Sequence, residues 1–154
     1  MTPVIAGDLL IVSGIRKGTS GYRIAKNGAA LAATQAWHNP DVPMYMSSPV
    51  VDGALLYGFS NKRKGQIFCL EAATGTVKWT TDGRAGQNAA LQIAGRNLVV
   101  LTTEGDLIVA NKNPEKFEEL HRYKVADGQT WAQPVVLKDG VIIRSADAVS
   151  FWSW

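Results

Sequence analysis

The chain has 154 residues, of which 46% are hydrophobic and 19% are charged, so it can form one ordinary domain or part of a larger one. This composition excludes a disordered chain, and the longest stretch without Asp, Glu, Lys or Arg, residues 27–40, is too short and too polar for a membrane span. The net charge of +3 comes from scattered residues; the basic run Lys62-Arg63-Lys64 is interpreted as a solvated turn, so we expect no nucleic-acid partner.

Four segments share one pattern, in which an apolar run, a turn with a glycine and a second apolar run predict a β-hairpin. The turn glycines are Gly7, Gly53, Gly95 and Gly140, separated by 46, 42 and 45 residues. A repeat of this length, with about four short strands in each unit, is typical of a β-propeller blade.

The second half of each unit supplies two further strands. In the first unit, residues 21–28 predict a third strand and its turn. The alanine-rich residues 29–37 have helical propensity, but the neighbouring units favour a strand there. In the second unit, residues 65–71 and 76–81 predict two strands around a tight turn at residues 72–75.

The third and fourth units follow the same plan. Residues 105–110 and 117–125 occupy the places of the last two strands in the third unit. Tyr123 stands 44 residues after Trp79, so we expect it to repeat the aromatic position of that outer strand. The fourth unit, residues 130–154, predicts three strands.

The predicted strands are apolar on both faces. Ile67 and Cys69 point to one side and Phe68 and Leu70 to the other, which favours sheets stacked face to face. A doubly wound α/β fold would also bury both faces, but no amphipathic helix separates these strands. Cys69 is therefore interpreted as a small buried apolar residue rather than a reactive thiol.

The sequence predicts an all-β fold: a partial β-propeller of four-stranded antiparallel blades, with about three and a half blades in a single domain. The approximate blades are residues 1–46, 47–88, 89–130 and 131–154. In such an arc, the outer faces of the first and last blades would be apolar and exposed to water. We therefore expect the chain either to form a homo-oligomer or to be part of a longer propeller whose other blades are missing here. The alternative is a closed four-bladed ring in which residues 2–5 complete the last sheet.

The segment of residues 69–79 resembles the signature of PQQ-like β-propeller repeats, Ala-x-Asp-x-x-Thr-Gly-x-x-x-Trp. Thr74, Gly75 and Trp79 match, whereas Cys69 and Glu71 replace the Ala and the Asp. These positions are assigned to the fold: Thr74-Gly75 suits a tight turn, and Trp79 can lie over that turn and wedge between blades.

Some propellers of the superfamily that this chain resembles are quinoprotein dehydrogenases. Those enzymes carry a vicinal cysteine pair, a catalytic Asp and calcium ligands. Cys69 is the only cysteine here, and His38 and His121 have no partner cysteine. Ser47 and Ser48 have no nearby His, and the glycine-rich residues 83–88 precede no helix. We therefore predict no catalytic, cofactor-binding or metal-binding residue, no bound quinone and no quinone-dependent dehydrogenase activity.

The resemblance favours a non-catalytic propeller that acts as a protein-interaction scaffold, as in the propeller lipoprotein of the outer-membrane β-barrel assembly machine. It implies a bacterial protein that is periplasmic or extracellular, although residues 1–8 contain no export signal. The alternatives are a fragment of a quinoprotein dehydrogenase and a propeller that binds a carbohydrate or another small ligand.

The expected recognition sites are blade-connecting loops. The candidates are residues 38–46, which contain Met44, Tyr45 and Met46, and residues 81–88. These Met and Tyr side chains are types common in protein contacts, but they can equally pack beneath the next blade.

Overall fold

A computed structural model describes residues 1–154, and it consists of four antiparallel sheets in chain order. The first contains β1 (Val4–Ala6), β2 (Leu9–Gly14), β3 (Gly18–Asn27) and β4 (Ala30–Asn39). The second contains β5 (Val50–Asp52), β6 (Leu55–Ser60), β7 (Gln66–Glu71) and β8 (Val77–Thr80), with the 3₁₀ turn η1 (Lys62–Lys64) between β6 and β7.

The third sheet contains β9 (Ala89–Ala94), β10 (Asn97–Thr102), β11 (Asp106–Asn111) and β12 (Glu118–Lys124). The fourth has three strands, β13 (Val135–Val136), β14 (Gly140–Arg144) and β15 (Val149–Ser153). The structure therefore confirms an all-β partial propeller of about three and a half blades. It contains no helix long and apolar enough to cross a membrane.

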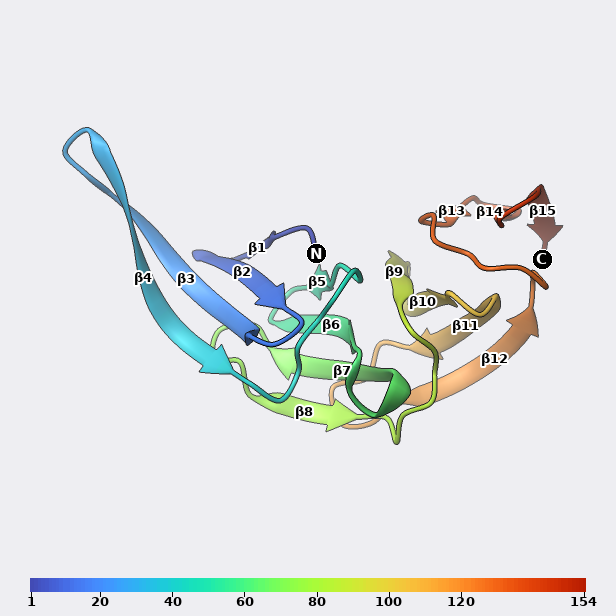
Figure 1. The fold of residues 1–154 in the computed structure, drawn as a ribbon, viewed down its shortest axis with the longest axis horizontal. Helices are drawn as coiled ribbons and strands as arrows, with labels where there is room; N and C mark the ends of the chain where they lie inside the picture. The colour runs from blue at the N-terminus through green and yellow to red at the C-terminus, as the bar shows by residue number, and fades with distance from the viewer.

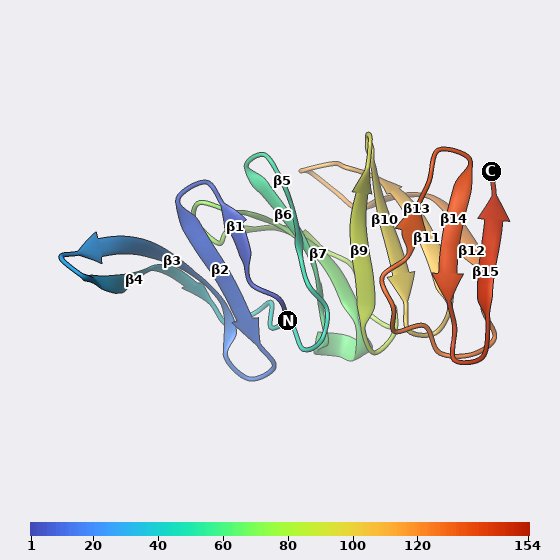
Figure 2. The same cartoon turned by 90° about the horizontal axis from the view of Figure 1, so that it is seen from above.

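The sheets fan out side by side in chain order, with β1–β4 at one end and β13–β15 at the other (Figures 1 and 2). The alternative of a closed four-bladed ring is wrong for this structure. β1 pairs with β2 inside the first sheet, with Val4 opposite Ile11, and the last sheet has only its own three strands, β13, β14 and β15.

The alanine-rich segment is strand β4, as the repeat predicted. It pairs with β3 from Asn39 opposite Thr19 to Ala30 opposite Asn27, so the hairpin ladder overrides the helical propensity of alanine. The far half of this hairpin extends beyond the sheet into solvent (Figure 1).

Three apolar clusters lie between successive sheets and hold the arc together. Phe68 and Leu70 of β7 pack toward the first sheet, whereas Ile67 and Cys69 pack toward the third. Val141 and Ile143 of β14 meet the outward face of the third sheet in the last cluster. Both faces of the inner sheets are therefore buried, as the sequence predicted.

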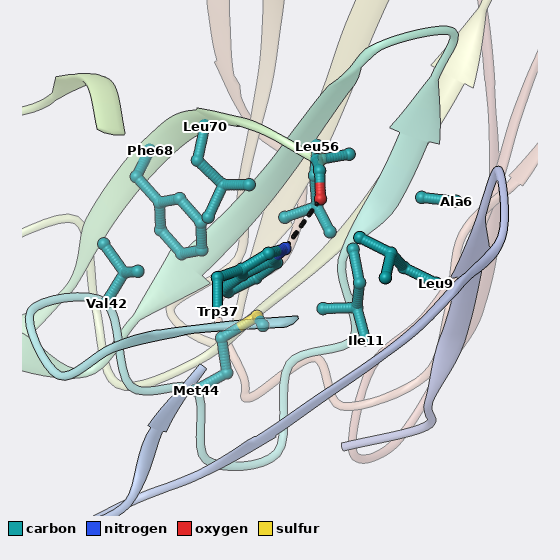
Figure 3. Close-up of a cluster of buried hydrophobic side chains, with 10 residues drawn as sticks. Ala6, Leu9, Ile11, Trp37, Val42, Met44, Leu56, Phe68 and Leu70 are labelled. Carbon is teal, nitrogen blue, oxygen red and sulfur yellow. Dashed lines mark hydrogen bonds between the residues drawn. The ribbon is translucent and has the colours of Figure 1, made fainter. Parts of the chain in front are cut away.

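A tryptophan links the first two sheets, as Figure 3 shows. Trp37 on β4 is only 8% exposed, and its indole Nε1 donates a hydrogen bond of 3.0 Å to the Ala72 carbonyl. A Cβ atom on Gly75 would lie 2.3 Å from the Trp37 ring, so the indole covers the turn of the following sheet.

The prediction that Trp79 covers the turn of its own sheet is wrong. Trp79 does lie between sheets, but its Nε1 donates to the Asn113 carbonyl at 2.7 Å, and its ring packs against Phe117. Trp37 and Trp79 both lie on the face of their outer strand that meets the next sheet, so each tryptophan closes over the turn one sheet further along.

The expected repeat of this position at Tyr123 is also wrong. Trp37 stands opposite Gly21 and Trp79 opposite Cys69, in each case next to a β-bulge. In the third sheet the residue beside the corresponding bulge is His121, opposite Val109, and Tyr123 lies two residues beyond it. His121 is exposed and stacks on Tyr123.

Candidate functional site

The loops that join one sheet to the next all lie at the same end of the arc. In each four-stranded sheet, neighbouring strands are antiparallel and follow one another in the sequence, so the sheet begins and ends at the same end of the arc. The loops that join successive sheets, residues 40–49, 81–88 and 125–134, therefore lie at that end, together with the turns between the second and third strands. We call this end the loop face; it is the lower edge in Figure 2. The opposite end has tighter turns, several of which use a glycine with positive φ.

The first candidate loop divides into buried and exposed residues. Val42 and Met44 are buried in the cluster between the first two sheets, and the Met44 backbone N–H donates to Ser13 Oγ at 2.9 Å. Tyr45 and Met46 are exposed. Met44 therefore packs beneath the next blade, whereas its two neighbours face solvent.

The second candidate loop is anchored at both ends. Thr81 Oγ1 accepts a hydrogen bond of 3.0 Å from the Ile67 N–H. Asn88 is buried, and its Oδ1 accepts the Met46 N–H at 3.3 Å, which ties the two candidate loops together. Between these anchors, Asp82, Arg84 and Gln87 are exposed.

Four large apolar side chains project from the loop face, each between 44% and 56% exposed. They are Ile15, Tyr45, Met46 and Trp131. The sequence prediction included Tyr45 and Met46 but missed Ile15 and Trp131, which lie in loops that carried no composition signal. An end face with aromatic, Met and branched aliphatic side chains has the residue types that protein interfaces use.

The hydroxyl and thiol groups near this face have structural roles. Ser47 Oγ accepts the Ala89 N–H at 2.9 Å, and Ser48 Oγ accepts the Thr2 N–H at 3.0 Å. Cys69 is fully buried between the second and third sheets, which confirms its interpretation as an apolar core residue. Burial raises the pKa of its thiol to about 11, so the thiol stays protonated at neutral pH.

The histidines do not form a metal centre. His38 Nδ1 lies 2.9 Å from Ser20 Oγ in the first sheet, and His121 stacks on Tyr123 in the third. Nowhere in the chain do three His, Cys, Asp or Glu side chains gather closely enough to hold a metal ion.

Comparisons with known proteins agree with this architecture. A family model described as outer membrane protein assembly factor BamB matches residues 1–81. No curated protein matches the sequence. Among solved structures, BamB from Moraxella catarrhalis superposes with a TM-score of 0.71 at 21% identity, over 99% of this chain and 44% of that one. The chain thus spans less than half the length of that BamB.

Two further structures show the same fold at lower identity. The computationally designed Ika4 protein gives a TM-score of 0.70 at 9% identity, over 98% of this chain and 88% of that one. The WD40 β-propeller domain of Doa1 gives 0.68 at 13% identity, over 97% of this chain and 49% of that one. At these identities the likeness concerns the fold alone.

Proposed function

The chain belongs to the β-propeller family described as outer membrane protein assembly factor BamB, and on that premise we propose that it is a non-catalytic scaffold that binds another protein through its loop face. The observation that supports this role is the gathering of Ile15, Tyr45, Met46 and Trp131 on one end of the arc. Exposed apolar side chains grouped in this way are costly in water unless they are covered.

The loop face has the rigidity that recognition requires. Met44 and Asn88 hold the backbone on either side of the exposed residues, through the hydrogen bonds to Ser13 and Met46. A partner that binds there orders few additional residues, so less of the binding free energy is lost to conformational entropy. We also propose that the protein acts in the bacterial periplasm, because the family name refers to assembly of outer membrane proteins.

Site-specific photo-crosslinking in the bacterial envelope tests this proposal. A photoreactive side chain at position 45, 46 or 131 should give defined adducts with one protein. The same group at position 24 or 31 should give none, since Ile24 and Leu31 are also exposed, at 44% and 76%, but lie on the protruding hairpin. Adducts that form equally from the hairpin and the loop face would contradict the proposal.

The outer sheets support a second proposal about assembly. Val135, Phe151 and Val149 are exposed on the outward side of the fourth sheet. At the corresponding places of the second sheet, Val50 is partly buried and Cys69 and Ile67 are buried against the third sheet. We propose that this side packs on a further blade, supplied by a second copy or by additional sequence.

Sedimentation of the 154-residue chain tests this proposal. The chain should self-associate, and Phe151→Ser should weaken the association. A stable monomer at high concentration would contradict it.

A further inference from the structure

Only three non-glycine residues of the chain have left-handed backbone conformations, and all three are cations. Arg63 has φ 48°, Lys64 has φ 62° and Arg84 has φ 63°. Asn and Gly are the residues that adopt this conformation most readily, above all in a tight turn between two strands such as β6 and β7. Positions that favour Asn or Gly therefore carry positive charge.

Two loops are locked together to bring these cations side by side. The Arg84 N–H donates to the Arg63 carbonyl at 3.0 Å, and the Gly86 N–H donates to the Lys64 carbonyl at 3.1 Å. Gly65 permits this approach, because a Cβ atom there would lie 2.2 Å from the Gly86 carbonyl oxygen. Arg84 thus joins a basic turn that lies about 20 residues earlier in the chain.

None of these three cations has an ion-pair partner. The salt bridges of the chain involve other residues, and nearby Lys62 pairs with Asp41 at 3.0 Å. Glu104 lies close by but forms no ion pair with them; its carboxylate accepts the Gln87 N–H at 2.9 Å and the Thr103 hydroxyl at 3.1 Å. Three positive charges are therefore available to a ligand.

The cations border two adjoining hollows on the loop face. The larger has a volume of about 830 Å³, and its lining includes Tyr45, Asn61, Lys64, Arg84, Gln87 and Glu104. The smaller has a volume of about 540 Å³ and includes Arg63, Lys64, Asp82 and Arg84. We call the two together the cation hollow.

We propose that the cation hollow binds an acidic segment of a polypeptide. This inference rests on the proposed scaffold function and names the chemistry of the partner. A polypeptide fits better than a nucleic acid or a compact phosphate, because three cations and two carboxylates, Asp82 and Glu104, leave the cation hollow with a net charge of only +1. That charge suits a few spaced carboxylates rather than a dense array of phosphates. Tyr45, Asn61 and Gln87 offer apolar and amide contacts that suit spaced carboxylates on a peptide backbone.

Fluorescence anisotropy with a labelled ten-residue peptide of alternating glutamate and serine tests the inference at low ionic strength. The site variant is Arg63→Asn, Lys64→Gly and Arg84→Gly, which places favoured residues at the left-handed positions and should not lower the melting temperature. The control variant is Lys26→Gln, Lys116→Gln and Lys138→Gln, which removes the same charge from exposed positions elsewhere. The site variant should bind at least about tenfold more weakly, whereas the control should change by less than about twofold.

Three results would overturn the inference. These are an equal loss in both variants, no binding of the peptide to the parent chain, or tighter binding of polyphosphate or single-stranded DNA than of the peptide. The crosslinking from position 131 is independent of these cations. If the crosslink from position 131 forms while the peptide fails to bind, the scaffold function stands and the acidic ligand does not. If the peptide binds but no crosslink forms, the acidic ligand stands and the scaffold function does not.

Discussion

Replacing Trp37 by alanine tests how successive sheets are held together. Its indole is 8% exposed, lies over Gly75 and donates to the Ala72 carbonyl. A tryptophan buries about 150–250 Å² at about 25 cal/mol per Å², which sets the lost burial at about 4–6 kcal/mol. Partial collapse of the cavity reduces this, and buried Trp→Ala changes generally cost about 3–5 kcal/mol. We expect a loss of unfolding free energy in that range.

Two variants separate the contributions to this loss. Trp37→Phe keeps most of the packing but leaves the Ala72 carbonyl without its donor, so it should cost about 1–3 kcal/mol. His121→Ala is the matched control, because His121 has the same register beside a β-bulge but is exposed. It should change stability by less than about 0.5 kcal/mol.

Urea unfolding followed by circular dichroism gives these three differences. For a chain of this size, Trp37→Ala should also lower the melting temperature by about 10 °C, whereas His121→Ala should leave it almost unchanged. If Trp37→Ala and His121→Ala had the same small effect, Trp37 would not lie between the sheets, and the inter-sheet contact described above would be incorrect.

Three further predictions follow from the same packing. Gly75→Ala should cost more than about 2 kcal/mol, because its Cβ would clash with the Trp37 ring, whereas Gly53→Ala, with a similar positive φ and open space, should cost about 1 kcal/mol; urea unfolding of the pair compares them. Trp79→Ala should cost about 2 kcal/mol in the same assay, less than Trp37→Ala, because Trp79 is only partly buried. Burial raises the pKa of Cys69 in the folded state to about 11, above its value in the unfolded chain, so the Cys69 contribution to the unfolding free energy should fall by about 2 kcal/mol as pH rises from 9 to 11; Cys69→Ala should show a shallower fall, and an equal fall in both proteins would contradict this.

The fold could be predicted because the sequence repeats a local signal. Gly7, Gly53 and Gly95 all have φ close to 60° in turns with open space around them, so the requirement for glycine is set by the backbone alone. Strands such as β7 are apolar on both sides because each sheet is covered by its two neighbours. Both features are visible in a single sequence.

Contacts between blades could not be predicted in the same way. Trp79 and its motif turn are close in sequence, but the indole closes over a turn more than thirty residues further on. Tyr123 stands 44 residues after Trp79, whereas the turn glycines Gly53 and Gly95 are 42 residues apart. The shorter spacing leads to His121, which lies beside the bulge in the same register as the two tryptophans. Because an aromatic residue stands two positions beyond His121, residue type alone favoured the wrong register.

The candidate site shows the same division between local and distant information. Residue type alone could not separate Met44 from Tyr45 and Met46, because burial depends on the hydrogen bond from Met44 to Ser13 and on the cluster between two sheets. The basic run at Lys62 had the composition of a solvated turn. Its proposed ligand-binding role depends on Arg84, which another loop brings beside it.

The loop face combines a fixed backbone with free side chains, and this combination bears directly on specificity. Met44 and Asn88 anchor the loops from below, so Tyr45, Met46 and Arg84 project from a backbone that is already ordered. The apolar side chains provide area that excludes water, and the neighbouring cations select which charged segment can lie beside it. A partner with apolar residues but no carboxylates would cover Tyr45 and leave Arg84 unpaired. A partner that carries both would satisfy the whole face, which is why the two properties are best tested on the same chain.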